Sequence, residues 1–579
     1  MKHIVFILSA FIFVQVNGQN NIIVTNSQAK NVLQVNYNPN AYKASNVISN
    51  PKQIAQEILN EVNADSLKEL ITTLATFKNR NSGADTLSNT QGIGAARRWI
   101  YSKFEQFSLE NEQRLIPTYL QFDQNICGIG QHRNVMAVLP GTDTMSKEVI
   151  IIEGHFDSRC AGACDTACVA QGIEDNATGT ALIMELARVM SKYSYKNSIV
   201  FVATTAEEQG LLGASALARY CFENGIKVKA VLNNDVIGGV VCGKTSSEPS
   251  CPCENDVDST SVRLFSFGGF NSKWKQLARY LKLQYMEEVL PITKVPMKLT
   301  IMTLEDRVGR GGDHIPFRQN GFASMRFTSA NEHGNAASSL PDYMDRQHSS
   351  DDILGIDTDN DQIIDSFFVD FNYLARNAVI NGVGASMIAL APQTPDLNLS
   401  VFHGRRLVVE ITNQTQHSTY RVAVRSETND WDSVYTTTKL LDTFYPPDKA
   451  TYFVSVASVD GNGVESLFSR EVTANATYNE NITNKGNSTI ELLQNRPNPF
   501  DLATIISVKS NALIQYKSAY ILIRDIQGKE VQKLPISLNK EINEVAFSYD
   551  YGQQGVYSYS YSLIIDGKVH STKQMIFAN

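Results

Sequence analysis

Residues 149–158, which read VIIIEGHFDS, decide the fold. Four consecutive apolar residues before the charged ones are typical of a strand that is buried on both faces of a parallel sheet. Alternating strand and helix signals predict an α/β/α sandwich, a three-layer fold in which helices cover both faces of a mostly parallel sheet. Further solid apolar runs and amphipathic stretches carry this alternation: 135–139, 180–190, 199–203, 210–222 and 230–232.

Ionisable side chains follow the predicted strands. His155, Glu207, Glu208 and Asp235 each come just after an apolar run, and in such sheets ligands bind at the carboxyl ends of the strands. With Asp175 and His348, which lie elsewhere along the chain in turns, they make two histidines and four acidic groups, which could hold a pair of Zn²⁺ ions and an activated water. The chain contains no His-Glu-x-x-His sequence, which excludes a zinc peptidase of the thermolysin type.

The order of five motifs resembles the M28 family of zinc aminopeptidases over roughly residues 50–390. The motifs are GHFDS at 154–158, EDNATG at 174–179, AEEQG at 206–210, ND at 234–235 and QHSSD at 347–351. Three more stretches resemble family blocks: RNSG at 80–83, residues 134–142, and DHIPF at 313–317.

The resemblance implies a metal-ligand set for two Zn²⁺ ions per chain. Asp175 would bridge the two ions. His155 and Asp235 would complete one site. Glu208 and His348 would complete the other.

The resemblance also implies roles for residues beside these ligands. Glu207 would act as the general base, and Asp157 would accept the second N–H of the His155 imidazole. His314 and His333 are the alternatives to His348 as the last ligand, with His314 otherwise lying behind the metal site or on the substrate side. Charged residues near the third block could contact a peptide terminus or form surface salt bridges: Arg310, Arg326 and Glu332.

The implied activity is that of an aminopeptidase, in which a zinc-bound hydroxide attacks the first peptide bond. A carboxypeptidase, a dipeptidase and a single-zinc glutaminyl cyclase remain alternatives on the same fold. A non-catalytic surface binding protein is the alternative from another class. The extra length before His348, residues 242–295, includes a segment at 265–295 that is predicted to cap the cleft and to shape specificity.

The first 18 residues have the parts of a secretory signal: a basic start, a short apolar run and small residues. No later segment approaches the about 20 apolar residues of a transmembrane helix. The formal charge of −8, without a basic cluster, argues against nucleic acid as a partner. We therefore expect an exported protein without a transmembrane segment.

Eight cysteines are consistent with export, because an oxidising compartment favours disulfides. We expect them to staple loops rather than bind metal, with the connectivity open. Three follow His155 closely and three more lie within a dozen residues of one another; the full set is Cys127, Cys160, Cys164, Cys168, Cys221, Cys242, Cys251 and Cys253.

The sequence changes character after the peptidase-like region. Residues 452–466 resemble the late strands of a fibronectin type III domain, although the usual tryptophan of its second strand is absent. The C-terminal block resembles the C-terminal sorting domain of the type IX secretion system of Gram-negative bacteria, in the motifs at 493–500, 523–529, 555–557, 566–568 and 573–575. This resemblance implies that the secretion machinery is a partner, besides peptide substrates, and that the protein passes through the periplasm to the cell surface or the medium.

These observations predict the following division of the chain: a signal peptide (1–18), an N-terminal loosely packed arm or pro-segment (19–50), an M28-like zinc peptidase domain (51–391), a fibronectin type III-like β-sandwich (392–475), a linker (476–490) and a type IX sorting domain (491–579).

Overall fold

The computed structural model describes most of the chain from residue 19 to residue 578. It does not describe 144, 146, 242–255, 269–272, 308–309, 331–345, 360, 362, 403–405, 413–416, 448–449, 477–489, 501–502, 512–515, 540–541 and 549–555. The predicted signal peptide, most of the predicted linker and five residues named above lie outside the described part: Cys242, Cys251, Cys253, Glu332 and His333.

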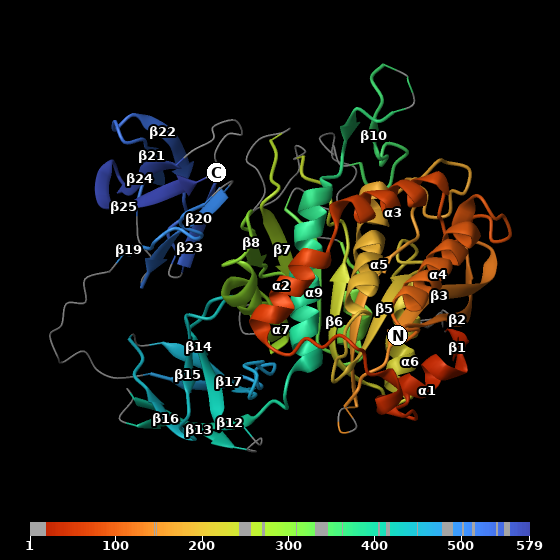
Figure 1. The fold of residues 1–579 in the computed structure, drawn as a ribbon, viewed down its shortest axis with the longest axis horizontal. Helices are drawn as coiled ribbons and strands as arrows, with labels where there is room; N and C mark the ends of the chain where they lie inside the picture. The colour runs from red at the N-terminus through yellow and green to blue at the C-terminus, as the bar shows by residue number, and fades with distance from the viewer. Residues whose placement is uncertain are drawn as a thin grey trace, which may run out of the picture.

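A nine-stranded sheet forms the centre of the large domain, in the order β1-β2-β3-β5-β4-β6-β9-β7-β8 (Figure 1). The four central strands β5, β4, β6 and β9 are parallel, and antiparallel pairings occur on both sides of them. The strands are β1 (Asn20–Val24), β2 (Ile116–Ile126), β3 (Ile129–Leu139), β4 (Glu148–His155), β5 (Ser198–Thr204), β6 (Lys227–Asn234), β7 (Ser261–Phe265), β8 (Lys298–Ile301) and β9 (Ser324–Ser329).

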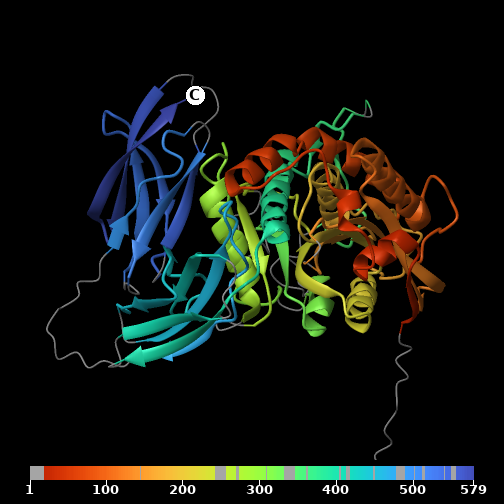
Figure 2. The same ribbon diagram turned by 60° about the horizontal axis from the view of Figure 1, so that its bottom comes forward.

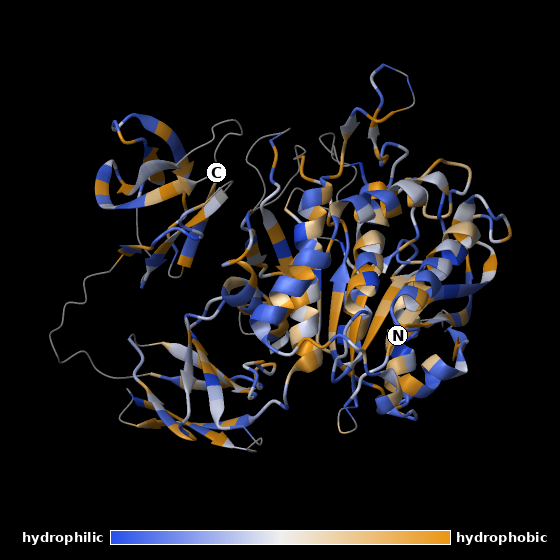
Figure 3. Cartoon of the chain, in the orientation of Figure 1, coloured by the Kyte–Doolittle hydropathy of each residue, from blue (hydrophilic) through white to orange (hydrophobic). Residues whose placement is uncertain are grey.

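Helices cover both faces of this sheet, which confirms the predicted fold class. Because successive side chains of a strand point to opposite faces, Ile150 and Ile152 join one apolar core while Val149 and Ile151 join the other. In Figure 3 the central strands carry the colours of apolar residues, whereas the outer helices carry both colours.

The first core is covered by α2 (Pro51–Glu61), α3 (Ala64–Thr76), α4 (Gly92–Glu110), α5 (Thr178–Met190), α7 (Gln276–Gln284) and α9 (Phe371–Leu390). The second core is covered by α1 (Ser27–Leu33), α6 (Leu212–Glu223) and α8 (His314–Gln319). Within the described residues, no helix combines the length and the apolarity needed to cross a bilayer.

The segment 19–50 differs from the expected loosely packed arm. Strand β1 pairs with β2 at the edge of the sheet, and Ala29, Val32 and Leu33 of α1 are buried. The side chain of Gln19 donates a hydrogen bond to the carbonyl oxygen of Leu212. The segment is therefore packed against the large domain.

The segment around 265–295 also differs from its prediction as a cap over the cleft. Leu277 and Leu281 of α7 are buried in the first core, where α7 packs beside α9. On its other side α7 meets the next domain, since Tyr280 donates a hydrogen bond to the carbonyl oxygen of Glu465. The helix lies in the core and not over the strand ends, because its apolar residues recur at helical spacing and form a face that must be buried.

Two antiparallel β-sandwiches follow the large domain, each built from a three-stranded and a four-stranded sheet (Figure 2). Each encloses an apolar core of its own. The first contains β12 (Asp396–Phe402), β13 (Arg406–Thr412), β14 (Thr419–Arg425), β15 (Ser433–Thr437), β16 (Leu441–Phe444), β17 (Thr451–Val459) and β18 (Val472–Asn475). The second contains β19 (Ile490–Leu492), β20 (Ala503–Ser510), β21 (Ala519–Arg524), β22 (Glu530–Pro535), β23 (Ile542–Ser548), β24 (Val556–Ile565) and β25 (Lys568–Ala578).

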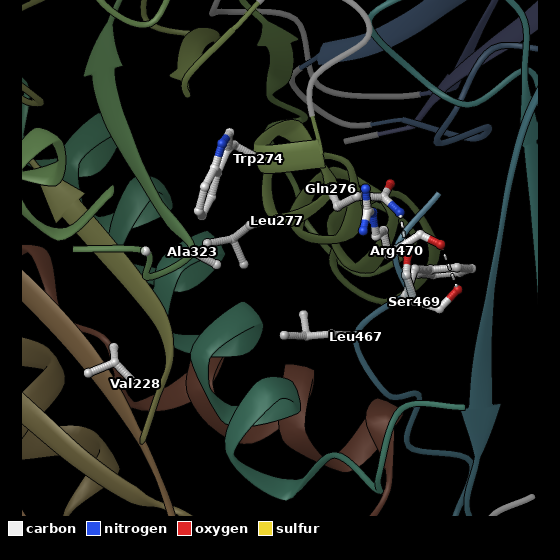
Figure 4. A pocket seen from close by; sticks show the side chains of 10 residues that line it. Val228, Trp274, Gln276, Leu277, Ala323, Leu467, Ser469 and Arg470 are labelled. Atoms are coloured by element: carbon white, nitrogen blue, oxygen red, sulfur yellow. Dashed lines mark hydrogen bonds between the residues drawn. The ribbon is translucent and has the colours of Figure 1, made fainter. Parts of the chain in front are cut away.

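A pocket of about 410 Å³ lies where α7 and the first sandwich meet (Figure 4). Gln276 spans this junction by donating a hydrogen bond to the carbonyl oxygen of Ser469. Val228 lines the pocket from the start of β6, whereas Asp235 follows the end of that strand. The pocket therefore lies at the opposite end of the sheet from the predicted metal ligands.

Candidate metal centre

The parallel strands bring the predicted ligands to one edge of the sheet. His155 ends β4, Glu207 and Glu208 follow β5, and Asp235 follows β6. Because β4 pairs in parallel with both β5 and β6, the carboxyl ends of all three strands coincide. Asp175 lies in the buried turn that leads into α5.

One carboxylate joins the two predicted histidine ligands. Oδ1 of Asp175 lies 3.0 Å from Nε2 of His155, and Oδ2 lies 3.1 Å from Nε2 of His348. Each oxygen of Asp175 therefore faces a different imidazole, which is the arrangement that a bridging carboxylate between two metal ions requires.

Further carboxylates complete both sides of Asp175. Oδ1 of Asp235 lies 3.4 Å from Nε2 of His155, and Oε2 of Glu208 lies 3.1 Å from Nε2 of His348. The ligand atoms form two compact groups, in which all atoms lie within 4.8 Å of one another: His155, Glu207 and Asp235 in the first, and Asp175, Glu208 and His348 in the second. The carboxylate of Glu207 is thus close enough to reach a metal ion or a water bound beside it.

The chemistry of this centre fits zinc. Oε1 of Glu208 is buried and makes no hydrogen bond to any residue in the described part of the chain, and Nε2 of His155 is buried and faces the carboxylates of Asp175 and Asp235. A buried carboxylate oxygen without a hydrogen bond, in a cluster of acidic groups, is costly unless a cation satisfies it. Imidazole nitrogens and carboxylate oxygens are ordinary Zn²⁺ ligands.

Asp157 holds the centre in two ways. Its carboxylate accepts hydrogen bonds from the backbone N–H groups of Glu207 and Glu208, each at 3.2 Å. Nδ1 of His155 lies 3.1 Å from the backbone carbonyl oxygen of Asp157 and 3.6 Å from its Oδ1. Nδ1 of His155 is therefore closer to the backbone carbonyl oxygen of Asp157 than to the carboxylate that the sequence analysis expected. The carboxylate of Asp157 instead fixes the turn that carries Glu207 and Glu208.

Burial and crowding shift the ionisation of these acids. Burial raises the pKa of Glu207 well above its usual range, and the neighbouring Asp235 and Glu208 act in the same direction. For Asp175, burial acts upward, but the hydrogen bonds from His155 and His348 hold its pKa well below its usual range. The centre thus keeps Asp175 as an anion suited to metal binding and makes Glu207 a stronger base than an exposed glutamate.

Two arginines approach the second group of ligands, and the sequence analysis did not identify Arg159. Nε of Arg159 lies 2.7 Å from Oε2 of Glu208, and its Nη2 lies 2.7 Å from Nδ1 of His348. Nη1 of Arg310 lies 3.3 Å from the same Nδ1 atom. Only the position of Arg159, directly after the GHFDS motif, could have drawn attention to it.

Arg326, expected as a possible contact for a peptide terminus, is fully buried instead. Its guanidinium lies 3.3 Å from Oδ2 of Asp235 and 3.2 Å from Oδ2 of Asp306. It therefore supports Asp235 from behind.

His314, the described alternative to His348, lies outside both ligand groups. Its Nε2 atom lies 3.1 Å from the carbonyl oxygen of Glu305, and burial lowers its pKa. The neighbouring Asp313 is also buried, which raises its pKa to about 7, and it accepts a hydrogen bond from Thr204. Both residues pack behind the strand ends.

Disulfides staple the loop after His155, as predicted. They join Cys127 to Cys164 and Cys160 to Cys168. Cys221 is a free, buried thiol whose pKa is raised by burial to about 12.

An α/β sheet with carboxylates and imidazoles gathered at its strand ends defines a metal-dependent hydrolase, and comparison with known proteins makes it a zinc metallopeptidase. Residues 134–370 match the model of peptidase family M28. A probable zinc metalloprotease of the fungus Pyricularia oryzae is 30% identical over 387 residues, which cover 64% of this chain and 73% of that protein. The chain belongs to peptidase family M28.

Other relatives and solved structures are similar to part of this chain. A probable zinc metalloprotease of Leptosphaeria maculans is 29% identical over 435 residues, 72% of this chain and 96% of that protein. The LapA aminopeptidase of Legionella pneumophila matches with a TM-score of 0.42 and 18% identity over 58% of this chain and 75% of that one. A glutaminyl cyclase of Porphyromonas gingivalis matches with a TM-score of 0.37 and 16% identity over 56% of this chain and 98% of that one.

Proposed function

We propose that this metallopeptidase is an aminopeptidase with two zinc ions, which removes residues from the N-terminus of peptides. The observation that carries the proposal is the position of Asp175, whose two oxygens face Nε2 of His155 at 3.0 Å and Nε2 of His348 at 3.1 Å. A single-zinc enzyme such as a glutaminyl cyclase has no need for a carboxylate shared in this way.

In the proposed site, His155 and Asp235 would hold one ion, Glu208 and His348 would hold the other, and Asp175 would be shared by both. Zinc bound there would polarise the peptide carbonyl and lower the pKa of a water molecule toward neutrality. The side chain of Arg326 keeps Asp235 in place, because it is buried against it.

Glu207 is the proposed general base. Its carboxylate lies within 4.8 Å of ligand atoms of His155 and Asp235, a position that suits it to take the proton of the attacking water and to pass it to the leaving amine. The hydrogen bonds from the backbone N–H groups of Glu207 and Glu208 to Asp157 hold the turn that carries both glutamates.

The composition of the centre supports action at a free amine. A free N-terminus can pair with the carboxylate of Glu207 or, once deprotonated, bind zinc, and N-acetylation removes both interactions while leaving the scissile carbonyl unchanged. The test is a panel of matched free and N-acetylated peptides, assayed together with zinc analysis of the purified protein. We expect the free peptides to be cut at least about 100-fold faster than the N-acetylated ones, and the protein to contain two zinc ions per chain. Equal rates, or release of C-terminal residues, would refute the proposal.

We also propose that the protein is exported to the cell surface or the medium, with residues 491–579 as its address for a type IX secretion machinery and residues 392–475 as a fibronectin type III-like module. Residues 1–18 would be the signal peptide, 51–391 the peptidase domain and 476–490 a linker. Two observations support this division: each sandwich encloses its own core, and disulfides suit an oxidising compartment.

A further inference from the structure

We propose that Arg159, with Arg310 beside it, binds a carboxylate group of the substrate, so that the enzyme prefers peptides with an anionic group next to the metal centre. The inference rests on the proposed function of the same site and names the substrate class that this function leaves open.

Arg159 reaches into the centre from the disulfide-stapled loop after His155. Its Nε atom lies 2.7 Å from Oε2 of Glu208, and its Nη2 atom lies 2.7 Å from Nδ1 of His348. Its Nη1 atom lies 3.2 Å from the carbonyl oxygen of Ala161, within the loop itself. These three contacts hold the guanidinium at the rim of the second ligand group.

The contact with His348 cannot persist when a metal ion is bound. Nε2 of His348 faces Asp175 and Glu208, so it is the nitrogen that would bind the ion. A neutral imidazole that gives Nε2 to a metal carries its proton on Nδ1 and is a donor there. The N–H groups at Nη2 of Arg159 would then face the N–H at Nδ1 of His348, and two donors cannot form a hydrogen bond. Nη1 of Arg310, at 3.3 Å from the same Nδ1, would face the same conflict.

An anion from the substrate resolves this conflict. A guanidinium offers planar, paired donors that match the two oxygens of a carboxylate. The side chain of Arg159 is 20% exposed, so it can be reached from solvent, and His348 beside it is 16% exposed. Arg326 shows the contrast, because its side chain is 0% exposed and is already bound by Asp235 and Asp306.

Two groups of a peptide could supply the carboxylate. One is an acidic side chain near the scissile bond, and the other is the C-terminal carboxylate of a dipeptide. Both have the same chemistry, and amide isosteres that keep the shape and remove the charge distinguish them.

The test uses full-length, zinc-loaded enzyme and two pairs of substrates. The first pair is Glu-Leu-amide and Gln-Leu-amide, and the second is Leu-Leu and Leu-Leu-amide. We expect kcat/KM to favour the charged member of one pair by about 10- to 100-fold, the usual scale for a hydrogen-bonded charge. Arg159→Gln should bring that ratio close to one, and Arg159→Lys should restore part of it.

The ratio within a pair isolates this role, because loss of zinc or of folded protein lowers both rates together. Arg310→Gln provides a second variant and should reduce the same ratio. The matched control is Arg219→Gln, since Arg219 lies on α6 in an exposed ion pair with Glu223; it should leave the ratio unchanged.

Calorimetry provides a readout without turnover. Glutamic acid α-amide against glutaminamide reports on a side-chain carboxylate, and leucine against leucinamide reports on a main-chain carboxylate. Tighter binding of the charged member to wild type, lost in Arg159→Gln, supports the proposal. Equal binding within both pairs, or a preference that survives both arginine variants, overturns it. N-acetylated peptides cut as fast as free ones would overturn the aminopeptidase proposal alone, because the ratios here compare carboxylates and not amines.

Discussion

Oδ2 of Asp175 lies 3.1 Å from Nε2 of His348, although a long stretch of chain separates the two residues. Asp175 precedes α5 next to the central strands, whereas His348 comes after β9 and after residues outside the described part. Their approach closes the second ligand group, so the whole large domain must fold before the centre is complete.

His348 is expected to be a metal ligand and His314 is not. His348→Ala should reduce bound zinc by about one ion per chain and lower activity severely, because a ligand to the metal is lost. His314→Ala is the matched control and should keep its zinc, since His314 faces the carbonyl oxygen of Glu305. Metal analysis of both variants decides the matter, and loss of zinc from the His314 variant would show that the assignment is reversed.

Glu207 is expected to be the general base and not a ligand. Glu207→Gln should lower kcat by about 10²- to 10⁴-fold while zinc content stays near that of wild type. Glu208→Gln serves as the comparison and should lose metal, because Oε2 of Glu208 faces His348. If Glu207→Gln loses metal as well, Glu207 is a metal ligand and its assignment as the general base is wrong.

Asp157 is expected to affect both glutamates together. Asp157→Ala removes the acceptor of the backbone N–H groups of Glu207 and Glu208, so zinc affinity should fall by about 10- to 100-fold and activity should fall with it. Asp165→Ala, in an exposed part of the neighbouring loop, is the control. Zinc titration and kinetics would count against this role if Asp157→Ala kept wild-type values of both.

Glu465 is expected to make the junction between the large domain and the first sandwich sensitive to pH. Burial raises its pKa to about 7; Arg421 and the hydrogen bond from Gln284 oppose this shift, while Glu287 and Glu288 add to it. A carboxyl group with a raised folded-state pKa stabilises the fold fully below its unfolded value of 4.5, and this stability is lost as the pH rises to about 7.

Calorimetric unfolding between pH 4.5 and 7.5 tests this expectation. The free energy of unfolding of the wild type should fall by about 1–3 kcal/mol between pH 4.5 and 7.5. In Glu465→Gln, which imitates the protonated form, it should fall by less. Glu410→Gln, on an exposed part of β13, is the control. Parallel pH profiles for wild type and Glu465→Gln would contradict the prediction.

Deletion of residues 491–579 is expected to leave an active peptidase that fails to leave the periplasm. The second sandwich has its own core, and none of the ligands of the centre comes from it, so its removal should cost the centre little. Cell fractionation with an activity assay tests both parts. A truncated protein that still reaches the medium, or one that is inactive when purified, would refute the idea.

The sequence predicted the parts of the fold where burial is complete. Strands β4 and β5 were identified because apolar residues fill both of their faces, as a parallel central strand requires. Strand β2 was missed, since only every other side chain of its first half is buried. Helix α9 was also missed: buried residues surround it, so no polar face reveals its period.

The candidate site shows the same division between local and distant information. His155, Glu207 and Asp235 could be predicted because each follows a recognisable strand. Arg159 could not be assigned a role, because its partners Glu208 and His348 come from other parts of the chain. The interaction of Asp157 with two backbone N–H groups was hidden for the same reason.

The stapled loop that carries Arg159 offers a place where this enzyme can be re-engineered. Residues 161–163 and 165–167 are exposed and add nothing to either core, so substitutions there cost little stability. The crosslinks from Cys160 to Cys168 and from Cys127 to Cys164 keep the loop anchored while its sequence varies. Libraries confined to this loop would sample new substrate preferences while leaving every zinc ligand in place.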